Sequence, residues 1–330
     1  MCNAEIPNDS VYLEDFDFLP YMTVFALGEA GAKVMDRAAV EWPESTGHVQ
    51  WWWCRTDHKY RAYSEDCADP DFCAACADPD VCAALADRAW EGVISQERWD
   101  DILDRMETLM DWKAHLGNCE RHNCNGEYLM ILADQKQWFD FLAAASLAKI
   151  ARGQGYAVIG VITTEEPSSG DALAGKALQK ERRLFRGAAD CTVCLPRTAE
   201  QAPESLLWPA ARTLAAALAT QTWIGFDFAN IKSVFQSGKN AWIGTGSADT
   251  TDAATDELLA SPAFVKHAPN MSGAFVLVTC PPDTGLDAVD HAVSQILEAM
   301  DPETVDPAVF VWTANFEETE TARIAVIAAV

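Results

Sequence analysis

The chain has 330 residues, of which 49% are hydrophobic, so it is long and apolar enough to bury two packed cores. Its 50 acidic and 24 basic residues give a formal net charge of −26. A surface this acidic repels phosphate backbones and anionic lipid, which argues against binding nucleic acid or a membrane surface by bulk electrostatics. The same acidic excess is typical of a protein adapted to high salt, where screening weakens self-repulsion.

Residues 1–20 form an acidic N-terminal tail that ends at Pro20. The tail lacks the basic and then apolar pattern of a signal peptide, and the chain has no run of eighteen apolar residues. We therefore expect a cytoplasmic protein without direct membrane binding.

Residues 21–200 alternate between strand and helix patterns, which predicts a parallel sheet covered by helices on both faces. Gly28 and Gly31 lie between the first strand and the first helix, the arrangement that opens many nucleotide-binding sheets. The predicted strands are 21–27, 49–54, 128–133, 157–163 and 191–195. The predicted helices are 33–39, 95–112, 138–152 and 173–185.

A cysteine-rich insert at residues 64–126 contains a nine-residue tandem repeat, which gives a Cys-x5-Cys-x2-Cys-x5-Cys array. Thiolates at this spacing can hold zinc or an iron–sulfur cluster. Two other interpretations remain open: the cysteines fill small packing positions between Asp-Pro turns, or they form a reversible disulfide. The candidate metal ligands are Cys67, Cys73, Cys76 and Cys82, with Cys119 and Cys124 as alternates.

Residues 201–223 are alanine-rich and predict one long helix. The loop after it carries Asp227 between two phenylalanines, and a carboxylate there can cap a following helix at 228–238. A second α/β pattern fills residues 224–330. Its predicted strands are 241–245, 274–280, 309–315 and 323–330, and its predicted helices are 255–259 and 286–299.

The stretch from Gly225 to Lys232 reads Gly-Phe-Asp-Phe-Ala-Asn-Ile-Lys, and it resembles the loop that follows the central helix of FtsZ, the tubulin-like cell-division GTPase. The resemblance continues through residues 244–248, 258–262, 274–280 and 323–329. It implies a tubulin/FtsZ-like α/β fold. The implied parts are a Rossmann-like parallel-sheet domain at 21–200, a central helix at 201–223, and a C-terminal α/β domain with a four-stranded sheet at 224–330.

In this family, Gly28, Gly31, Thr56 and Asp57 would be remnants of the nucleotide site. The family's loop, which reaches the nucleotide of the next subunit, has the pattern Asn-x-Asp-x-x-Asp. Asp227 matches its middle acid, whereas Gly225 and Asn230 replace its first and last members. The resemblance therefore leaves Asp227 as a vestigial catalytic residue.

The segment from Lys136 to Leu142 aligns with the glycine-rich phosphate loop of FtsZ, yet it contains no glycine. Close approach of backbone to phosphate needs residues without a Cβ. We expect the aromatic residues of this segment to fill the space of a triphosphate, and two acids to repel it, so GTP binding is not expected. The aromatic residues are Trp138, Phe139 and Phe141, and the acids are Glu29 and Asp140.

These features predict an FtsZ/tubulin-like pseudo-GTPase of a cytoskeletal or cell-division system. Its partner would be a second copy of itself or another FtsZ/tubulin-like subunit, whose filament it would cap or regulate. Two alternatives remain: a working GTPase with a rebuilt phosphate loop, and a metal- or redox-sensing module on the same fold.

Overall fold

The structure is a computed structural model. It describes residues 22–42, 49–54, 128–165, 185, 187–220, 222, 227–235, 240–300, 309–317 and 319–330. Within these ranges, no helix is long and apolar enough to cross a bilayer.

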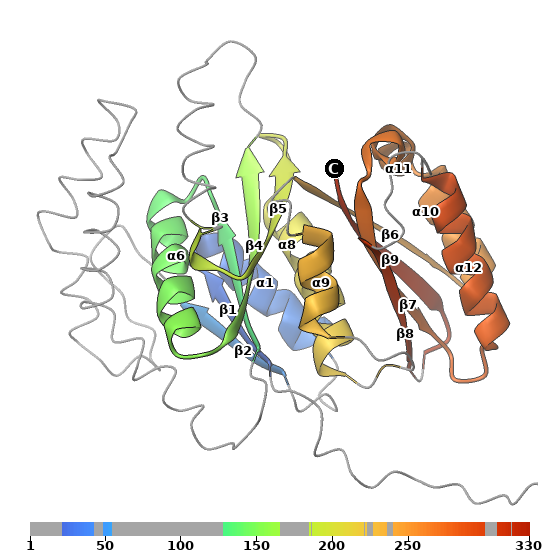
Figure 1. Ribbon diagram of the computed structural model, residues 1–330, viewed down its shortest axis with the longest axis horizontal. Helices are drawn as coiled ribbons and strands as arrows, with labels where there is room; N and C mark the ends of the chain where they lie inside the picture. The colour runs from blue at the N-terminus through green and yellow to red at the C-terminus, as the bar shows by residue number, and fades with distance from the viewer. Residues whose placement is uncertain are drawn as a thin grey trace, which may run out of the picture.

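A five-stranded sheet forms the N-terminal half of the described chain, with every neighbouring pair of strands parallel (Figure 1). All five strands were predicted from the sequence, because strands buried on both faces of a parallel sheet read as short apolar runs. The strand order is β2-β1-β3-β4-β5. The strands are β1 (Met22–Leu27), β2 (Val49–Cys54), β3 (Tyr128–Asp134), β4 (Ala157–Glu165) and β5 (Cys191–Arg197).

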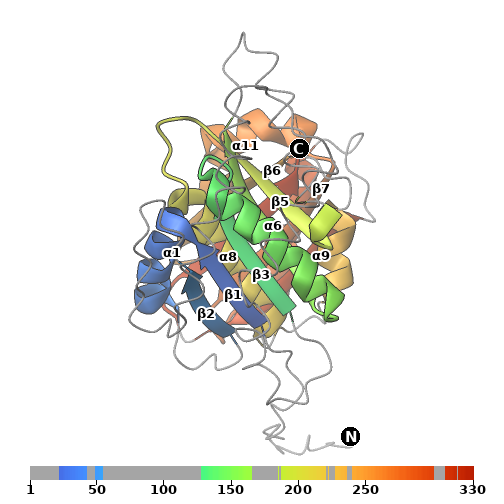
Figure 2. The same cartoon turned by 90° about the vertical axis from the view of Figure 1, so that its left-hand side faces the viewer.

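Helices cover both faces of this sheet, as the alternating pattern predicts. Alternate residues along each strand face α1 (Gly28–Glu41) and α8 (Glu204–Ala219) on one side and α6 (Trp138–Gly153) on the other. Figure 2 shows α6 crossing in front of the strands, with α8 behind them. The two resulting cores consist almost entirely of aliphatic, alanine and aromatic side chains.

The second sheet has four strands in the order β6-β9-β7-β8, and its strands match the sequence prediction. β9 is antiparallel to both of its neighbours, whereas β7 and β8 are parallel. The strands are β6 (Ala241–Ala248), β7 (Gly273–Cys280), β8 (Phe310–Phe316) and β9 (Ala322–Ala329). The helical segments outside this sheet are α10 (Thr251–Ala260), α11 (Pro262–His267), the 3-10 turn η2 (Ala268–Asn270) and α12 (Leu286–Ala299).

Helices α8 and α9 (Phe228–Phe235) lie between the two sheets (Figure 1). Their apolar side chains pack with residues from both, including Leu277 and Ile327 of the second sheet. α8 falls within the predicted helix 201–223, and α10 begins four residues before the predicted start because Thr250 caps it, accepting a hydrogen bond from Ala253 N–H.

The predicted end of β5 was also wrong. β5 continues through Pro196 to Arg197, whereas the sequence prediction ended it at Leu195. Proline cannot donate a ladder hydrogen bond, but β5 is an edge strand of its sheet, where that loss is tolerated. The predicted helix 95–112, and 173–185 apart from Phe185, lie outside the described residues, and the domain bounds stay predictions.

Candidate functional site at the carboxyl edge of the parallel sheet

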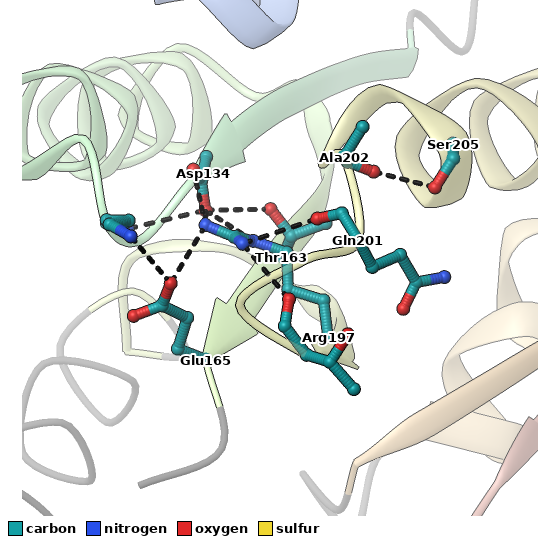
Figure 3. A network of polar contacts seen from close by, with 9 residues as sticks. Asp134, Thr163, Glu165, Arg197, Gln201, Ala202 and Ser205 are labelled. Carbon is teal, nitrogen blue, oxygen red and sulfur yellow. Dashed lines mark hydrogen bonds and ion pairs between the residues drawn. The ribbon is translucent and has the colours of Figure 1, made fainter. Parts of the chain in front are cut away.

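A buried ion pair joins the ends of β3 and β5 at the carboxyl edge of the sheet, the edge where open parallel sheets bind ligands. Asp134, the last residue of β3, is 2% exposed, and Arg197, the last residue of β5, is 4% exposed. Arg197 Nη2 lies 3.2 Å from Asp134 Oδ2, and its Nε donates to Oδ1 at 3.4 Å (Figure 3). Thr163 Oγ1 donates to the same Oδ1 at 3.0 Å. The carboxylate is therefore neutralised and hydrogen-bonded, as a buried charge must be.

A second acid extends this network toward solvent. Glu165, at the end of β4, lies 3.4 Å from Arg197 Nη2 and 2.9 Å from Lys136 Nζ. Arg197 Nη1 donates to the carbonyl oxygens of Thr198 and Gln201, so that all of its nitrogens are engaged (Figure 3). These ion pairs and hydrogen bonds connect the carboxyl ends of β3, β4 and β5.

Next to this network, the side chains of Gln137 and Asp140 lie against the turn between β1 and α1. We call Gly28, Gln137 and Asp140 the Gly28 pocket. Gly28 has a φ of +69°, a backbone conformation that favours glycine. A Cβ at Gly28 would collide with the carboxylate of Asp140 and the amide oxygen of Gln137, so both side chains already occupy that position.

The carboxylate of Asp140 is buried there, at 2% exposure. Burial, and then the negative charge of Asp134, raise the pKa of Asp140 from 3.8 to about 7. Asp140 Oδ1 and Gln137 Oε1 are both buried, and neither accepts a hydrogen bond from a described residue. Here the main-chain turn that approaches phosphate in nucleotide-binding sheets faces side-chain oxygens instead.

The structure brings Asp140, one of the two acids predicted to repel a triphosphate, to Gly28, whereas two other residues of the prediction, Phe141 and Glu29, lie elsewhere. Phe141 is fully buried in the core under α6, where its ring centroid lies 5.5 Å from that of Phe185. Glu29 is exposed on α1, and its carboxylate lies 3.4 Å from Lys33 Nζ. The side chains of Trp138 and Phe139 lie outside the described part.

The second predicted glycine has a packing role. A Cβ on Gly31 would come within 2.6 Å of the backbone carbon of Ala26, so glycine here lets α1 lie close against β1. Thr56 and Asp57 lie outside the described residues.

The predicted metal ligands also fall outside the described ranges: Cys67, Cys73, Cys76, Cys82, Cys119 and Cys124. Among the residues that the structure describes, no three His, Cys, Asp or Glu side chains are grouped as metal ligands. Zinc or iron–sulfur binding by the insert thus stays a prediction.

Asp227 caps α9, as the sequence suggested. Its Oδ1 accepts a hydrogen bond from Asn230 N–H at 3.1 Å, and Asn230 Oδ1 accepts one from Asp227 N–H at 2.9 Å. This reciprocal pair satisfies two backbone donors at the start of the helix. Asn230, which stands where the family's loop has its last acid, is thus a capping residue.

Asp227 lies at the opposite end of the sheet from the Gly28 pocket. Its charge contributes to raising the pKa of Tyr128, after burial, and the rings of Tyr128 and Phe228 lie 6.0 Å apart. Tyr128 begins β3 and Asp134 ends it, which places them about 20 Å apart at ~3.3 Å per residue. A single copy of the chain therefore does not bring Asp227 to the pocket.

Sequence reasoning missed the Asp134–Arg197 pair and the role of Gln137. The two charged partners are 63 residues apart, and neither stands in a motif. The position of Phe141 was detectable, because its spacing with Ala144, Ala145 and Ala148 marks the face of α6 that packs on the sheet.

A parallel sheet with a glycine turn at its carboxyl edge, joined through a central helix to a second four-stranded sheet, defines the tubulin/FtsZ class of folds. Among solved structures, the FtsZ dimer of M. jannaschii matches with a TM-score of 0.61 and 17% identity, covering 97% of this chain and 90% of that one. CetZ2 from Haloferax volcanii, in a GTPγS-bound protofilament, matches with a TM-score of 0.57 and 15% identity, covering 93% and 92%.

Sequence comparison also finds similarity to FtsZ proteins. The chain is 26% identical over 192 residues to cell division protein FtsZ 1 of Halobacterium salinarum, covering 53% of this chain and 47% of that protein. It is 25% identical over 194 residues to FtsZ of Methanothermobacter thermautotrophicus, covering 53% and 49%. The matches thus span about half the length of these relatives, and no protein-family model matches the chain. The chain thus has the tubulin/FtsZ-like fold and is similar in sequence to FtsZ proteins over about half of its length.

Proposed function

We propose that this chain is a pseudo-GTPase of a cytoskeletal or cell-division system. It binds no nucleotide itself, and it acts by associating with a second copy of itself or with an FtsZ-like relative. The observation that carries the proposal is the Gly28 pocket, where Asp140 and Gln137 occupy the space beside the glycine turn. A phosphate bound at such a turn needs free backbone N–H groups and no Cβ.

Charge supports the same conclusion. A triphosphate at this edge would lie near Asp134, Asp140 and Glu165, of which only the first and last have cationic partners among the described residues. Those cations, Arg197 and Lys136, are already paired with carboxylates. Bringing a phosphate here would add negative charge beside a buried carboxylate, which is unfavourable in a medium of low dielectric constant.

The other half of a composite site would come from a neighbouring copy through the Asp227 loop. The polar side chains of Asp227 and Asn230 accept the hydrogen bonds that cap α9, and Asn230 cannot act as a base. If this loop covered the end of a filament, it would therefore bring at most one carboxylate, that of Asp227, to the nucleotide site of the neighbouring subunit. One similar structure is a dimer and another is a protofilament, which supports association between copies as the role of this surface.

The first test is nucleotide affinity. We expect no tight GTP binding and no GTP turnover by the purified protein in high salt with magnesium, measured by calorimetry and phosphate release. CetZ2 from Haloferax volcanii, solved with GTPγS, is the positive control. A micromolar dissociation constant together with turnover would contradict the pseudo-GTPase and leave a rebuilt phosphate loop as the better interpretation.

The second test separates capping of α9 from association. We expect Asp227→Arg to lose the cap, at a cost of about 1 kcal/mol in the free energy of unfolding, and also to weaken association. Sedimentation of wild type and variant, each alone and mixed with FtsZ 1 of Halobacterium salinarum, measures the second effect.

Thr250→Ala is the matched control, because it removes the N-cap of a different helix, α10, with a similar loss in the free energy of unfolding. This variant is expected to leave association unchanged. If Asp227→Arg lowers stability while association stays the same, Asp227 is a capping residue and the proposed surface lies elsewhere.

A further inference from the structure

Exposed charges of opposite sign lie at the two ends of β3. Asp227 is exposed at the end where the strand begins, since the ring of its neighbour Phe228 lies 6.0 Å from that of Tyr128, the first residue of β3. Lys136 follows the last residue of the strand by two positions, and its side chain is 60% exposed. The two charges therefore lie near opposite ends of one strand axis, about 20 Å apart at ~3.3 Å per residue.

The backbone of Lys136 is fixed, while its side chain can change partners. Its N–H donates to Asp134 Oδ1 at 3.3 Å, in the turn that follows β3. Its Nζ lies 2.9 Å from Glu165, which has a second cation, Arg197, at 3.4 Å. If Lys136 turned to another acid, Glu165 would keep Arg197, and an exposed ion pair contributes little to stability. Lys136 can therefore pair with a carboxylate from another molecule at small cost.

Asp227 can pair with a cation and still cap α9. The cap uses one carboxylate oxygen, Oδ1, which accepts from Asn230 N–H at 3.1 Å. An ionised carboxylate has two oxygens and about four acceptor sites, so it can accept from a lysine at the same time. The partly exposed rings of Tyr128 and Phe228 lie next to it, and apolar rings of this kind suit the methylene stem of a lysine.

We propose that copies of this chain associate head to tail along the β3 axis, with Lys136 of one copy paired to Asp227 of the next. The proposal rests on the association proposed above, and it names the partner as a second copy of this chain. Because the contact joins two unlike ends, it can repeat from copy to copy and build an open filament. The pair supplies a local attraction between molecules that otherwise repel each other, since each carries a net charge of −26.

The experiment exchanges the two charges and measures the dissociation constant by sedimentation, in about 1 M potassium chloride to screen the general repulsion. Lys136→Glu and Asp227→Arg each place like charges at the contact, and each should raise the dissociation constant at least about tenfold. The double variant restores an opposite pair with the signs exchanged. It should bring the dissociation constant back to within about threefold of the wild type.

Lys266→Glu is the matched control, because Lys266 is exposed on α11, outside the second sheet, and the change in net charge is the same. Alone, this variant should leave association unchanged. Combined with Asp227→Arg, it restores the net charge of the wild type but not the contact. That combination should therefore associate as weakly as Asp227→Arg.

A second measurement uses the wild type and depends on no variant. A carbodiimide joins a carboxylate to an amine only where the two are in contact, and one copy holds Asp227 and Lys136 near opposite ends of β3. Mass spectrometry should therefore find a cross-link between these two residues in the associated fraction and not in the monomer.

Three results would overturn the proposal, and they bear differently on the proposed function. If the wild type associates without this cross-link, or the double variant is no stronger than its Lys266→Glu counterpart, the contact is wrong and the association stands. If the wild type associates only with FtsZ 1 of Halobacterium salinarum, the partner is the relative and not a second copy. If the wild type stays a monomer in both cases, the proposed function fails as well.

Discussion

Replacing Arg197 with methionine is expected to lower the free energy of unfolding by about 3–5 kcal/mol. The substitution keeps an apolar stem of similar length but leaves Asp134 buried with no cation beside it. Removing one partner of a buried ion pair carries this cost because the remaining charge stays desolvated. Urea unfolding at constant salt, followed by tryptophan fluorescence, measures the change.

Two further variants test the explanation. Lys136→Met breaks the pair between Lys136 and Glu165, whose side chains are 60% and 31% exposed, and should cost less than about 1 kcal/mol. Adding Asp134→Asn to Arg197→Met removes the orphaned charge, while the amide oxygen still accepts from Thr163, and should restore at least about half of the loss. If Arg197→Met lowered the free energy of unfolding as little as Lys136→Met, the Arg197–Asp134 pair would contribute no more than an exposed ion pair.

The strands could be predicted from the sequence because each strand signal is local. Buried parallel strands are short apolar runs, and their bounding residues mark the ends. Pro196 misled the prediction for β5, since the rule that proline ends a strand does not hold at the edge of a sheet. Asp227 was also predictable as a cap, because its partner Asn230 lies only three residues away.

The site could be predicted only in part, because its chemistry depends on contacts between distant segments. The loss of glycine between Lys136 and Leu142 and the acid Asp140 were visible in the sequence, but the contacts of Asp140 and Gln137 with Gly28 were not. Adjacent residues on a helix point about 100° apart, so that Phe141 enters the core while Asp140 faces the turn. How α6 packs on the sheet decides which of the two residues faces the turn.

Asp140→Asn is expected to stabilise the protein by an amount that grows with pH. The pKa of Asp140 is about 7 in the folded protein against 3.8 as its ordinary value, so between these values the unfolded state has lost the proton and the folded state still holds it. Stability due to Asp140 therefore falls as pH rises through this window, by about 1.4 kcal/mol per pH unit. It levels off above pH 7, at a total of about 4 kcal/mol.

The measurement is the difference in free energy of unfolding between Asp140→Asn and the wild type, at pH 5 and at pH 8. We expect it to increase by about 3 kcal/mol, because the asparagine has no proton to lose. The exposed Asp252→Asn should show no such change. A difference that stays constant would mean that Asp140 keeps an ordinary pKa, and that its carboxylate is hydrated or paired in the folded protein. A carboxyl group that does titrate near pH 7 beside Gly28 is neutral in mildly acidic solution and anionic above it, and in the anionic form it repels a phosphate group at the turn.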